Sequence, residues 1–317
     1  MNNDVPTISV IMSVYREPLD WIQESIDSIL QQTFIDFEFI IVNDNPERTE
    51  LNAFLKANRI KDNRIIIINN EKNIGLTKSL NKGLDCAQGR YIARMDADDI
   101  AMPTRFEKQV NLLELRGDVG VCGSHIHYFG ASDFICKYPE TDEDMYWFLK
   151  SNMAHPAVMI RKSILNGIYY NPRFVVSQDY ALWIRLYEEG VVMYNIQEVL
   201  LRYRKSAEQI SSKSNSVQKK LSIGLRVRAF NHYCNENNID LKIGENGITP
   251  SLISDIIEKV HLPKSIKREF VFNLVLSVRC SLFSYIGLLI KFGTKMTFKQ
   301  FSKLIYYRMK GYDLQMF

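Results

Sequence analysis

The stretch Tyr91-Ile-Ala-Arg-Met-Asp96-Ala-Asp98-Asp99 places three carboxylates directly after a short apolar run. The run Tyr91–Met95 predicts a buried strand, and the end of such a strand lies at one edge of its sheet. Acids clustered at that edge suit a divalent cation bound against phosphates, because hard cations prefer oxygen ligands. A plainer alternative is that Asp98 or Asp99 caps a helix that begins near Pro103.

Strand and helix patterns alternate through the first hundred residues. The apolar runs that precede Tyr91 and predict strands are Ile8–Val14, Phe37–Asn43 and Arg64–Asn69. Between the strands we expect helices around Leu19–Leu30 and Leu76–Leu84, where apolar residues recur at helical spacing, and a polar helix around Leu51–Lys56. Repeated β-α units with nearly continuous apolar strands imply a largely parallel sheet with helices on both faces. Asp44 follows the second strand, so we expect it at the same edge of the sheet as Asp96.

Beyond Pro103 the pattern becomes mixed. Helical spacing recurs near Thr104–Leu115 and again from about Gln178. The segments that predict short strands are Val119–Phe129, Phe134–Lys137, Ala157–Arg161, Val191–Tyr194 and Val199–Tyr203. This second half therefore does not continue the simple β-α repeat.

The last part of the chain is basic. From His261 to the end, ten Lys and Arg face one Glu and one Asp, so this region carries +8 while the whole chain carries +4. This asymmetry predicts an anionic membrane surface, and not nucleic acid, as the partner. Phe270–Ile290 is apolar and about long enough to span a bilayer, but Arg279 lies in its middle. We favour helices lying in the membrane interface; packing against the rest of the protein and a membrane span are the alternatives.

The cysteines and the first residues suggest a compartment. The chain has five cysteines, an odd number, and no Cys-x-x-Cys pair. This favours buried, reduced thiols in a cytosolic protein. The opening residues Met1-Asn-Asn-Asp lack a basic and apolar signal segment, so we expect a cytoplasmic location.

Several motifs follow one another in a characteristic order. They are Ser9–Tyr15, Glu38–Asp44, Asn73-Ile-Gly75-Leu, Gly89–Asp99 and Gln178-Asp179. In this order and spacing the chain resembles the family 2 glycosyltransferases from roughly Thr7 to Tyr203. The resemblance implies the GT-A fold, a Rossmann-like α/β fold with a mainly parallel central sheet flanked by helices, here with a C-terminal helical extension. It implies a glycosyltransferase domain over residues 1–205, with a nucleotide-binding half (1–100) and an acceptor half (101–205). The residues that follow (206–317) are predicted from their own sequence to form a basic helical region.

The resemblance implies contacts with the nucleotide in the first half. Tyr15 and Glu17 would flank the nucleoside, and Asp44 would accept a hydrogen bond from the base or the ribose. Lys78 would face the diphosphate or the base. For Asp44 the alternative is to cap the turn that ends at Pro46. For Lys78 the alternative is an ordinary solvated lysine.

The resemblance also assigns roles to the acidic turn. Asp96 would contact the ribose or a metal-bound water and is a second candidate metal ligand. Asp98 would ligate the Mn²⁺ or Mg²⁺ that bridges the two phosphates, and Asp99 would orient the donor sugar. Arg202 or Arg204 would assist the diphosphate, with surface salt bridges as the alternative.

The resemblance makes Asp179 the general base that takes the proton of the acceptor hydroxyl. The usual motif is Glu-Asp, and here Gln178 replaces the Glu, which affects the surroundings of the base and not the base itself. As an alternative, Asp179 merely begins a helix. Attack opposite the leaving group would invert the anomeric carbon, so an α-linked donor would give a β-glycoside. His155 is a candidate for the acceptor pocket or for core packing.

Together these features predict a metal-dependent, inverting enzyme that uses a UDP-sugar. The Gln-x-x-Arg-Trp motif of processive synthases is absent from the sequence, which predicts one sugar per encounter. The basic tail suits a lipid-linked acceptor, such as a polyprenyl-diphosphate-linked sugar or oligosaccharide of O-antigen or capsule synthesis. The expected location is then the cytoplasm, peripherally associated with the inner membrane. The alternative function is a catalytically inactive, membrane-associated scaffold that binds nucleotide sugars.

Overall fold

The computed structural model describes residues 5–174, 176–206, 216–244, 250–263, 266 and 270. Packing divides the chain into two compact units. The first contains the described residues of 1–146 and 151–213, and the second contains 147–150 and the described residues from 216 onward. The predicted boundary near residue 205 stays a prediction.

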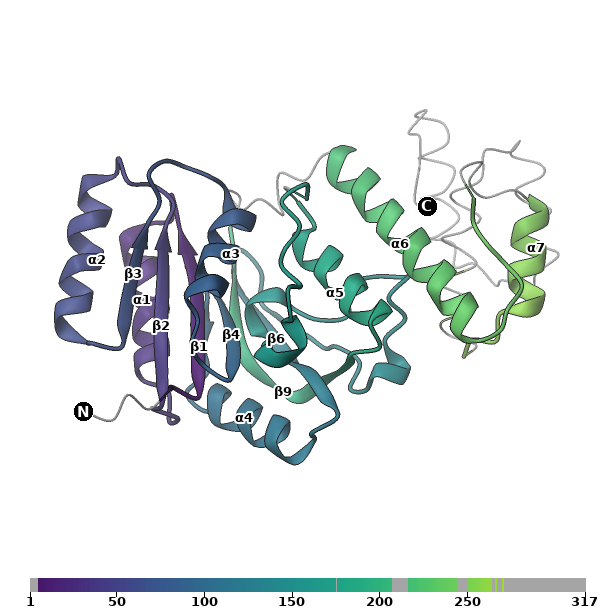
Figure 1. Cartoon of the computed structure of the whole chain (residues 1–317), viewed down its shortest axis with the longest axis horizontal. Helices are drawn as coiled ribbons and strands as arrows, with labels where there is room; N and C mark the ends of the chain where they lie inside the picture. The colour runs from purple at the N-terminus through teal and green to yellow at the C-terminus, as the bar shows by residue number, and fades with distance from the viewer. Residues whose placement is uncertain are drawn as a thin grey trace. The chain divides into compact units, whose positions relative to one another are not determined.

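The first half of the sheet is parallel, as predicted. Figure 1 shows its strands side by side in the order β3 (Ile65–Asn69), β2 (Phe37–Asn43), β1 (Ile8–Val14) and β4 (Tyr91–Asp96). The connecting helices are α1 (Leu19–Leu30), α2 (Thr49–Lys61) and α3 (Leu76–Cys86). Val14 pairs with Asn43, and Ser13 pairs with Asp96. The carboxyl ends of the three strands are therefore level, which confirms that Asp44 and Asp96 lie at one edge.

The second half of the sheet is mixed. After the two-residue strand β5 (Ile100–Ala101) the elements are α4 (Arg105–Leu115), β6 (Val119–Gly130), β7 (Phe134–Cys136), β8 (Met159–Arg161), α5 (Gln178–Glu188) and β9 (Val192–Lys205). β8 joins β4 to β6 with antiparallel pairing on both sides, β9 runs parallel to β6, and β5 and β7 form antiparallel edges. Short 3₁₀ turns occupy Asp142–Asp144, His155–Ala157 and Lys162–Leu165.

The prediction of two separate strands after Val191 is wrong, because β9 is one strand with a bulge. Ile196 pairs with Ser124, and Val199 pairs with the next residue, His125. Gln197 and Glu198 are therefore extra residues on β9, and both are exposed. A bulge accommodates a polar pair that would interrupt a regular ladder.

Two layers of apolar side chains cover β4. Tyr91, Ala93 and Met95 belong to the larger core, which also receives buried side chains of α1, α2 and α4. Ile92 and Arg94 lie on the opposite face, because successive strand residues alternate between faces. That second layer is built with Ile11, Leu80 of α3 and Leu182 of α5.

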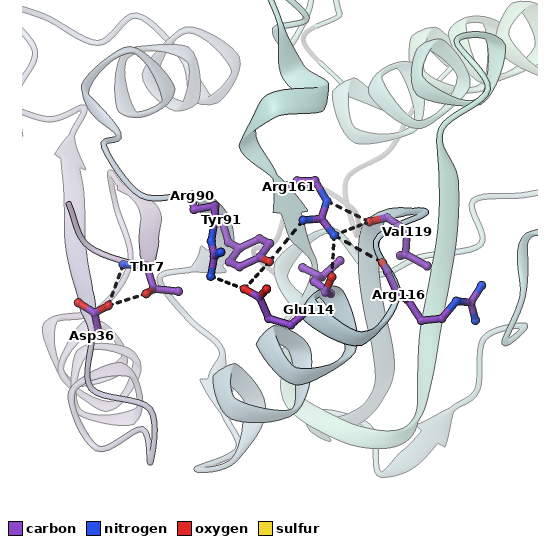
Figure 2. A network of polar contacts seen from close by, with 9 residues as sticks. Thr7, Asp36, Arg90, Tyr91, Glu114, Arg116, Val119 and Arg161 are labelled. Carbon is purple, nitrogen blue, oxygen red and sulfur yellow. Dashed lines mark hydrogen bonds and ion pairs between the residues drawn. The ribbon is translucent and has the colours of Figure 1, made fainter. Parts of the chain in front are cut away.

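Figure 2 shows polar contacts that hold the amino end of β4, at Tyr91, in place. This end of the strand is opposite the one that leads into the acids. The Tyr91 hydroxyl donates to Glu114 of α4 at 2.8 Å. Arg161, which pairs with Tyr91 across the ladder, donates to the carbonyl of Leu113 at 2.6 Å and to that of Val119 at 3.4 Å. Arg161 thus joins β8, α4 and β6 by filling backbone acceptors.

The second unit contains α6 (Ser216–Glu236) and α7 (Pro250–Lys259). The ring of Phe148 packs against those of Phe230, Tyr233 and Phe270, with centroid distances of 5.6, 5.2 and 4.9 Å. Apart from Phe270, the apolar segment Phe270–Ile290 lies outside the described residues, so its three alternatives stay open. No helix in the described part of the chain is long and apolar enough to cross a membrane.

The prediction of buried thiols is correct only in part. Cys122 and Cys234 are buried and Cys136 is half-buried, but Cys86 is exposed at the end of α3. These four described cysteines are all free thiols.

Candidate active site

The acidic turn forms one compact cluster at the carboxyl end of β4. One carboxylate oxygen each from Asp96, Asp98 and Asp99 can be chosen so that all three lie within 4.8 Å of one another. The Ser25 hydroxyl of α1 donates to the Asp96 carbonyl at 2.9 Å and holds the start of the turn. Helix α4 begins only at Arg105, with Thr104 in the N-cap position. The alternative that Asp98 or Asp99 caps this helix is therefore wrong.

Asp99 supplies the observation that tests a metal site. Its side chain is buried, and Oδ1 accepts a hydrogen bond from the Arg204 backbone N–H at 2.8 Å. Its Oδ2 has no hydrogen-bond partner among the described residues. Burial, and then the charges of Asp96 and Asp98, raise the pKa of Asp99 well above its ordinary value. A divalent cation fits these residues, because it would relieve the repulsion and satisfy the unpaired oxygen.

Arg204 of β9 braces the acidic turn from one side. Besides the backbone bond to Asp99, its Nε donates to the Asp98 carbonyl at 2.7 Å. Its guanidinium also pairs with Glu24 of α1 and lies 4.7 Å from the centre of the Trp21 ring. The salt bridge foreseen as an alternative is thus present, and a contact with the diphosphate stays a prediction.

Arg202 lies on the same strand and stacks on an aromatic ring. Its guanidinium is 4.4 Å from the centre of the Phe129 ring of β6. Ile100, the residue after the acidic turn, pairs with Arg202 in the ladder. The structure therefore brings Arg202 to the same region as the acids, and its role toward the diphosphate stays a prediction.

The loop after β1 is held against the loop after β2. Glu17 accepts the Tyr15 backbone N–H at 2.7 Å, and the Asn45 side chain donates to the Tyr15 carbonyl at 3.1 Å. Arg48 donates to the Glu17 carbonyl at 2.8 Å. Burial raises the pKa of Glu17, and the charge of Asp96 adds to that rise. Tyr15 and Glu17 therefore lie on an ordered loop within electrostatic reach of the acidic turn.

Asp44 organises the loop that leads into α3. Its Oδ1 accepts from the Asn70 side chain and from the Ile74 N–H, both at 2.8 Å. Its Oδ2 accepts from the Gly75 N–H at 2.9 Å. Gly75 has φ +86° and ψ 157°, a conformation that only glycine adopts readily. Asp44 thus holds a glycine-dependent turn at the carboxyl edge, and a bond to a nucleoside stays a prediction.

Two neighbouring positions complete this part of the site. The turn after β2 is closed by Asn43, whose Oδ1 accepts the Asn45 N–H at 2.9 Å. The capping role considered for Asp44 therefore belongs to Asn43. Lys78 lies in the first turn of α3 with an exposed side chain, where it is accessible to a ligand.

Asp179 lies in the first turn of α5, after Ser177, which adopts left-handed backbone angles with φ 58°. Burial raises the pKa of Asp179, and helix N–H groups at Asp179 and Tyr180 partly offset this rise. The charge of Asp96 also raises the pKa of Asp179, so the two carboxylates lie within electrostatic range. Asp179 thus lies at the start of a helix, as the alternative expected. Its carboxylate is also close enough to the acidic turn for the charge of Asp96 to raise its pKa.

His155 is a core residue. Its Nε2 lies 2.7 Å from the Tyr170 hydroxyl, and its ring packs against Trp183 of α5. Burial, together with the charge of Arg94, holds the pKa of His155 well below its ordinary value. The imidazole is therefore neutral and packed, as the core-packing alternative expected.

Arg94 has no role in the sequence interpretation, yet it contacts the site directly. It precedes Asp96 by two residues on β4 and forms an ion pair with the Asp96 carboxylate. The sequence feature that could have revealed this role is the single charged residue within the otherwise apolar run Tyr91–Met95.

Comparison with known proteins places the chain among glycosyltransferases. Residues 9–177 match the family model described as glycosyl transferase family 2. An uncharacterized glycosyltransferase of Methanocaldococcus jannaschii is 39% identical over 63% of this chain and 71% of its own length. A UDP-Gal:alpha-D-GlcNAc-diphosphoundecaprenol beta-1,3-galactosyltransferase of Escherichia coli is 32% identical over 66% of this chain and 78% of its own.

Solved structures share the fold. Residues 1–349 of S. aureus TarS, in complex with UDP-GlcNAc, superpose with a TM-score of 0.58 at 16% identity, over 98% of this chain and 89% of that one. The Pyrobaculum calidifontis mannosyltransferase PcManGT, in complex with GDP-Man and Mn²⁺, gives a TM-score of 0.54 at 14% identity, over 98% and 85%. These likenesses confirm the predicted GT-A fold.

Proposed function

Because the chain belongs to glycosyltransferase family 2, we propose that it transfers a single sugar from a UDP-sugar to a glycan acceptor, with inversion and with the help of a divalent cation. The observation that carries the proposal is the group of three acids at the end of β4, with a buried, unpaired oxygen on Asp99. The complexes of related folds with UDP-GlcNAc and with Mn²⁺ support a UDP-sugar and a divalent ion as ligands.

The acidic turn is proposed to hold Mn²⁺ or Mg²⁺ through Asp98 and Asp96. A cation bound there acts as a Lewis acid that offsets the charge developing on the leaving diphosphate. Asp99 is proposed to orient the donor sugar. Tyr15, Glu17, Asp44 and Lys78 are proposed to bind the nucleotide from the neighbouring loops, and Arg202 and Arg204 to assist the diphosphate.

Asp179 is proposed to take the proton from the acceptor hydroxyl. A carboxylate whose pKa is raised is a stronger base than an ordinary aspartate, so its environment suits this role. Attack from the side of Asp179, opposite the leaving group, would invert the anomeric carbon. The β-1,3 linkage in the name of the Escherichia coli relative supports a β-linked product.

The raised pKa of Asp179 predicts the pH dependence of transfer. Only the carboxylate accepts a proton, so kcat should fall about tenfold per pH unit once the pH drops below that pKa. Because the pKa lies above the ordinary 3.8, this loss should begin at a higher pH than for a solvated aspartate. Measuring kcat against pH at saturating substrates checks this, with circular dichroism confirming the fold at each pH. A rate that stays constant down to the range of a solvated aspartate would contradict the assignment.

The acceptor is proposed to be a polyprenyl-diphosphate-linked sugar of surface polysaccharide synthesis. The diphosphoundecaprenol acceptor in the name of the Escherichia coli relative supports this class. The test is transfer from a panel of UDP-sugars to a short-chain lipid diphosphate that carries GlcNAc or GalNAc, with the product examined by NMR. A β-linked product is expected from one donor. An α-linked product would refute inversion, and nucleotide-sugar binding without any product would favour the scaffold alternative.

The basic region after His261 is proposed to bring the enzyme to the anionic inner-membrane surface. Each Lys or Arg near such a surface contributes about 1 kcal/mol, so a region of +8 can hold the protein there reversibly. Deleting the residues after Leu262 should therefore abolish co-sedimentation with phosphatidylglycerol vesicles at low salt. The full chain on neutral phosphatidylcholine vesicles is the control. Undiminished binding of the shortened chain would exclude the region as the anchor.

A further inference from the structure

Arg94 is a buried cation in an apolar layer. It lies on the face of β4 that packs against α3 and α5, and its side chain is only 3% exposed. With Tyr170 and apolar side chains it lines a small cavity, whose other lining residues include Ile11, Leu80, Ile160 and Leu182. Burying a charge among such side chains destabilises the folded state unless the charge is paired and hydrogen-bonded.

Among the described residues, only one hydrogen-bonding group of this guanidinium has a partner. Nη2 pairs with Oδ1 of Asp96, whereas Nε and Nη1 are buried without a partner in the described part of the chain. A buried donor without a partner destabilises the folded state. The guanidinium therefore keeps its contact with Asp96 while two of its other donor atoms stay unpaired.

Arg105, the first residue of α4, shows how a purely structural buried arginine behaves in the same unit of the protein. It is fully buried, and its Nη2 donates to the carbonyls of Arg94 and Val158 at 2.8 and 3.1 Å. Its Nε donates to Gln109 at 3.1 Å. Arg105 thus fills backbone and amide acceptors of the core, and Arg94 does not.

We propose that Arg94 is a positioning residue for the cation site: by holding Oδ1 of Asp96 along the face of β4 that the two residues share, it turns the other carboxylate oxygen toward Asp98 and Asp99. This inference rests on the proposed role of the acidic turn as a divalent-cation site. Without the contact, Asp96 would rotate away from the two neighbouring carboxylates, which repel it. Outer partners that orient metal ligands typically change metal affinity by about 10–100-fold.

The direction of the effect distinguishes positioning from charge alone. Removing a nearby cation would by itself strengthen the binding of Mn²⁺, because the repulsion between the two positive charges disappears. Loss of orientation would weaken it. Arg94→Met removes the charge and the hydrogen bond, whereas Arg94→Lys keeps the charge and loses the planar guanidinium that reaches Asp96 from the side.

The experiment measures the affinity for UDP by calorimetry, with Mn²⁺ and with EDTA, in the full-length protein. The Mn²⁺-dependent gain in affinity reports on the acidic turn, and the affinity in EDTA reports on the nucleoside loops. Arg161→Met is the matched control, because Arg161 is an arginine of the same sheet. It lies on β8 and pairs with Tyr91, at the end of β4 that is away from the acidic turn. The thermal unfolding midpoint of each metal-free variant reports on structural damage.

We expect Arg94→Met and Arg94→Lys to reduce the Mn²⁺-dependent gain about tenfold. Their affinity in EDTA should be unchanged. The unfolding midpoint of Arg94→Met should change little, because Asp96, which loses its partner, is 28% exposed, and two unpaired buried donors of Arg94 are removed together with the charge. Arg161→Met should lower the midpoint and keep the gain. This combination would separate positioning from a structural role.

An undiminished or larger Mn²⁺-dependent gain in Arg94→Met would overturn the inference, as would a gain in Arg94→Lys equal to that of the natural protein. Equal losses in Mn²⁺ and in EDTA, with a lowered midpoint, would show a structural role instead. If the natural protein itself shows no Mn²⁺-dependent gain, the proposed cation site fails and the inference falls with it. Failure of the cation site would thus appear in the natural protein, whereas failure of the role of Arg94 would appear only in its variants.

Discussion

Asp179→Asn should abolish sugar transfer while leaving the affinity for UDP nearly unchanged. The amide has the size of the carboxylate but cannot accept the proton of the acceptor hydroxyl. General-base assistance typically contributes about 10²–10⁴ in rate, so kcat should fall by at least the lower of these factors. The change should barely affect the fold, because Asn also tolerates the first turn of a helix and α5 keeps its buried face.

A control on the same helix makes the result specific. Glu189→Gln removes an exposed acid at the opposite end of α5 and should leave both turnover and UDP affinity unchanged. Steady-state transfer kinetics and UDP calorimetry on both variants provide the measurement. Normal turnover by Asp179→Asn would remove Asp179 as the base, and a parallel loss of UDP affinity would indicate a binding role instead.

Asp98→Ala should remove the metal-dependent part of UDP affinity. A hard cation loses an oxygen ligand, and the remaining oxygens of Asp96 and Asp99 are too few to replace it. Loss of a direct ligand should exceed the change of about 10–100-fold that is typical when only a supporting partner is removed. In EDTA the variant and the natural protein should bind UDP alike, because the loops that hold Tyr15, Glu17 and Asp44 are unaffected.

Asp118→Ala is the matched control for this prediction. Asp118 is an exposed acid that pairs with Arg116 just before β6 and belongs to no cluster of potential metal ligands in the described part of the chain. It should leave the Mn²⁺-dependent gain intact. Equal gains in Asp98→Ala and Asp118→Ala would exclude Asp98 as a ligand, whereas a selective loss in Asp98→Ala would support it.

The parallel half of the fold could be predicted from the sequence because its signals are local. Each strand of the first hundred residues is a nearly continuous apolar run, and the helices around Leu19–Leu30 and Leu76–Leu84 each have one apolar face. The order of such units places their carboxyl ends at one edge, which brought Asp44 and Asp96 together correctly. The acidic turn was placed correctly at this edge because it directly follows the apolar run of β4.

The rest depended on contacts between distant segments. The bulge at Gln197 and Glu198 arises from pairing with β6, some seventy residues earlier, and no local pattern of β9 reveals it. The three bonds of Asp44 to Asn70, Ile74 and Gly75 likewise join separate loops.

Arg94 marks the limit of sequence reasoning for the site. That Arg94 shares a face of its strand with Ile92 and Asp96 could be read from the sequence. Only the packed layer shows that its guanidinium is buried with a single partner in the described part of the chain. His155 shows the converse. A histidine within the predicted acceptor half was a candidate for the acceptor pocket, and its burial against Tyr170 and Trp183 shows a neutral core residue.

The most direct test of metal-dependent glycosyl transfer is the release of UDP from UDP-sugars, with Mn²⁺ or with EDTA, in the presence and absence of a short lipid-diphosphate-GlcNAc acceptor. The proposed function predicts release from one donor that the acceptor stimulates and EDTA abolishes. UDP release that proceeds equally well in EDTA would contradict the role of the acidic turn. Absence of release from every donor, in a protein that also fails to bind UDP, would contradict the proposed transfer reaction itself.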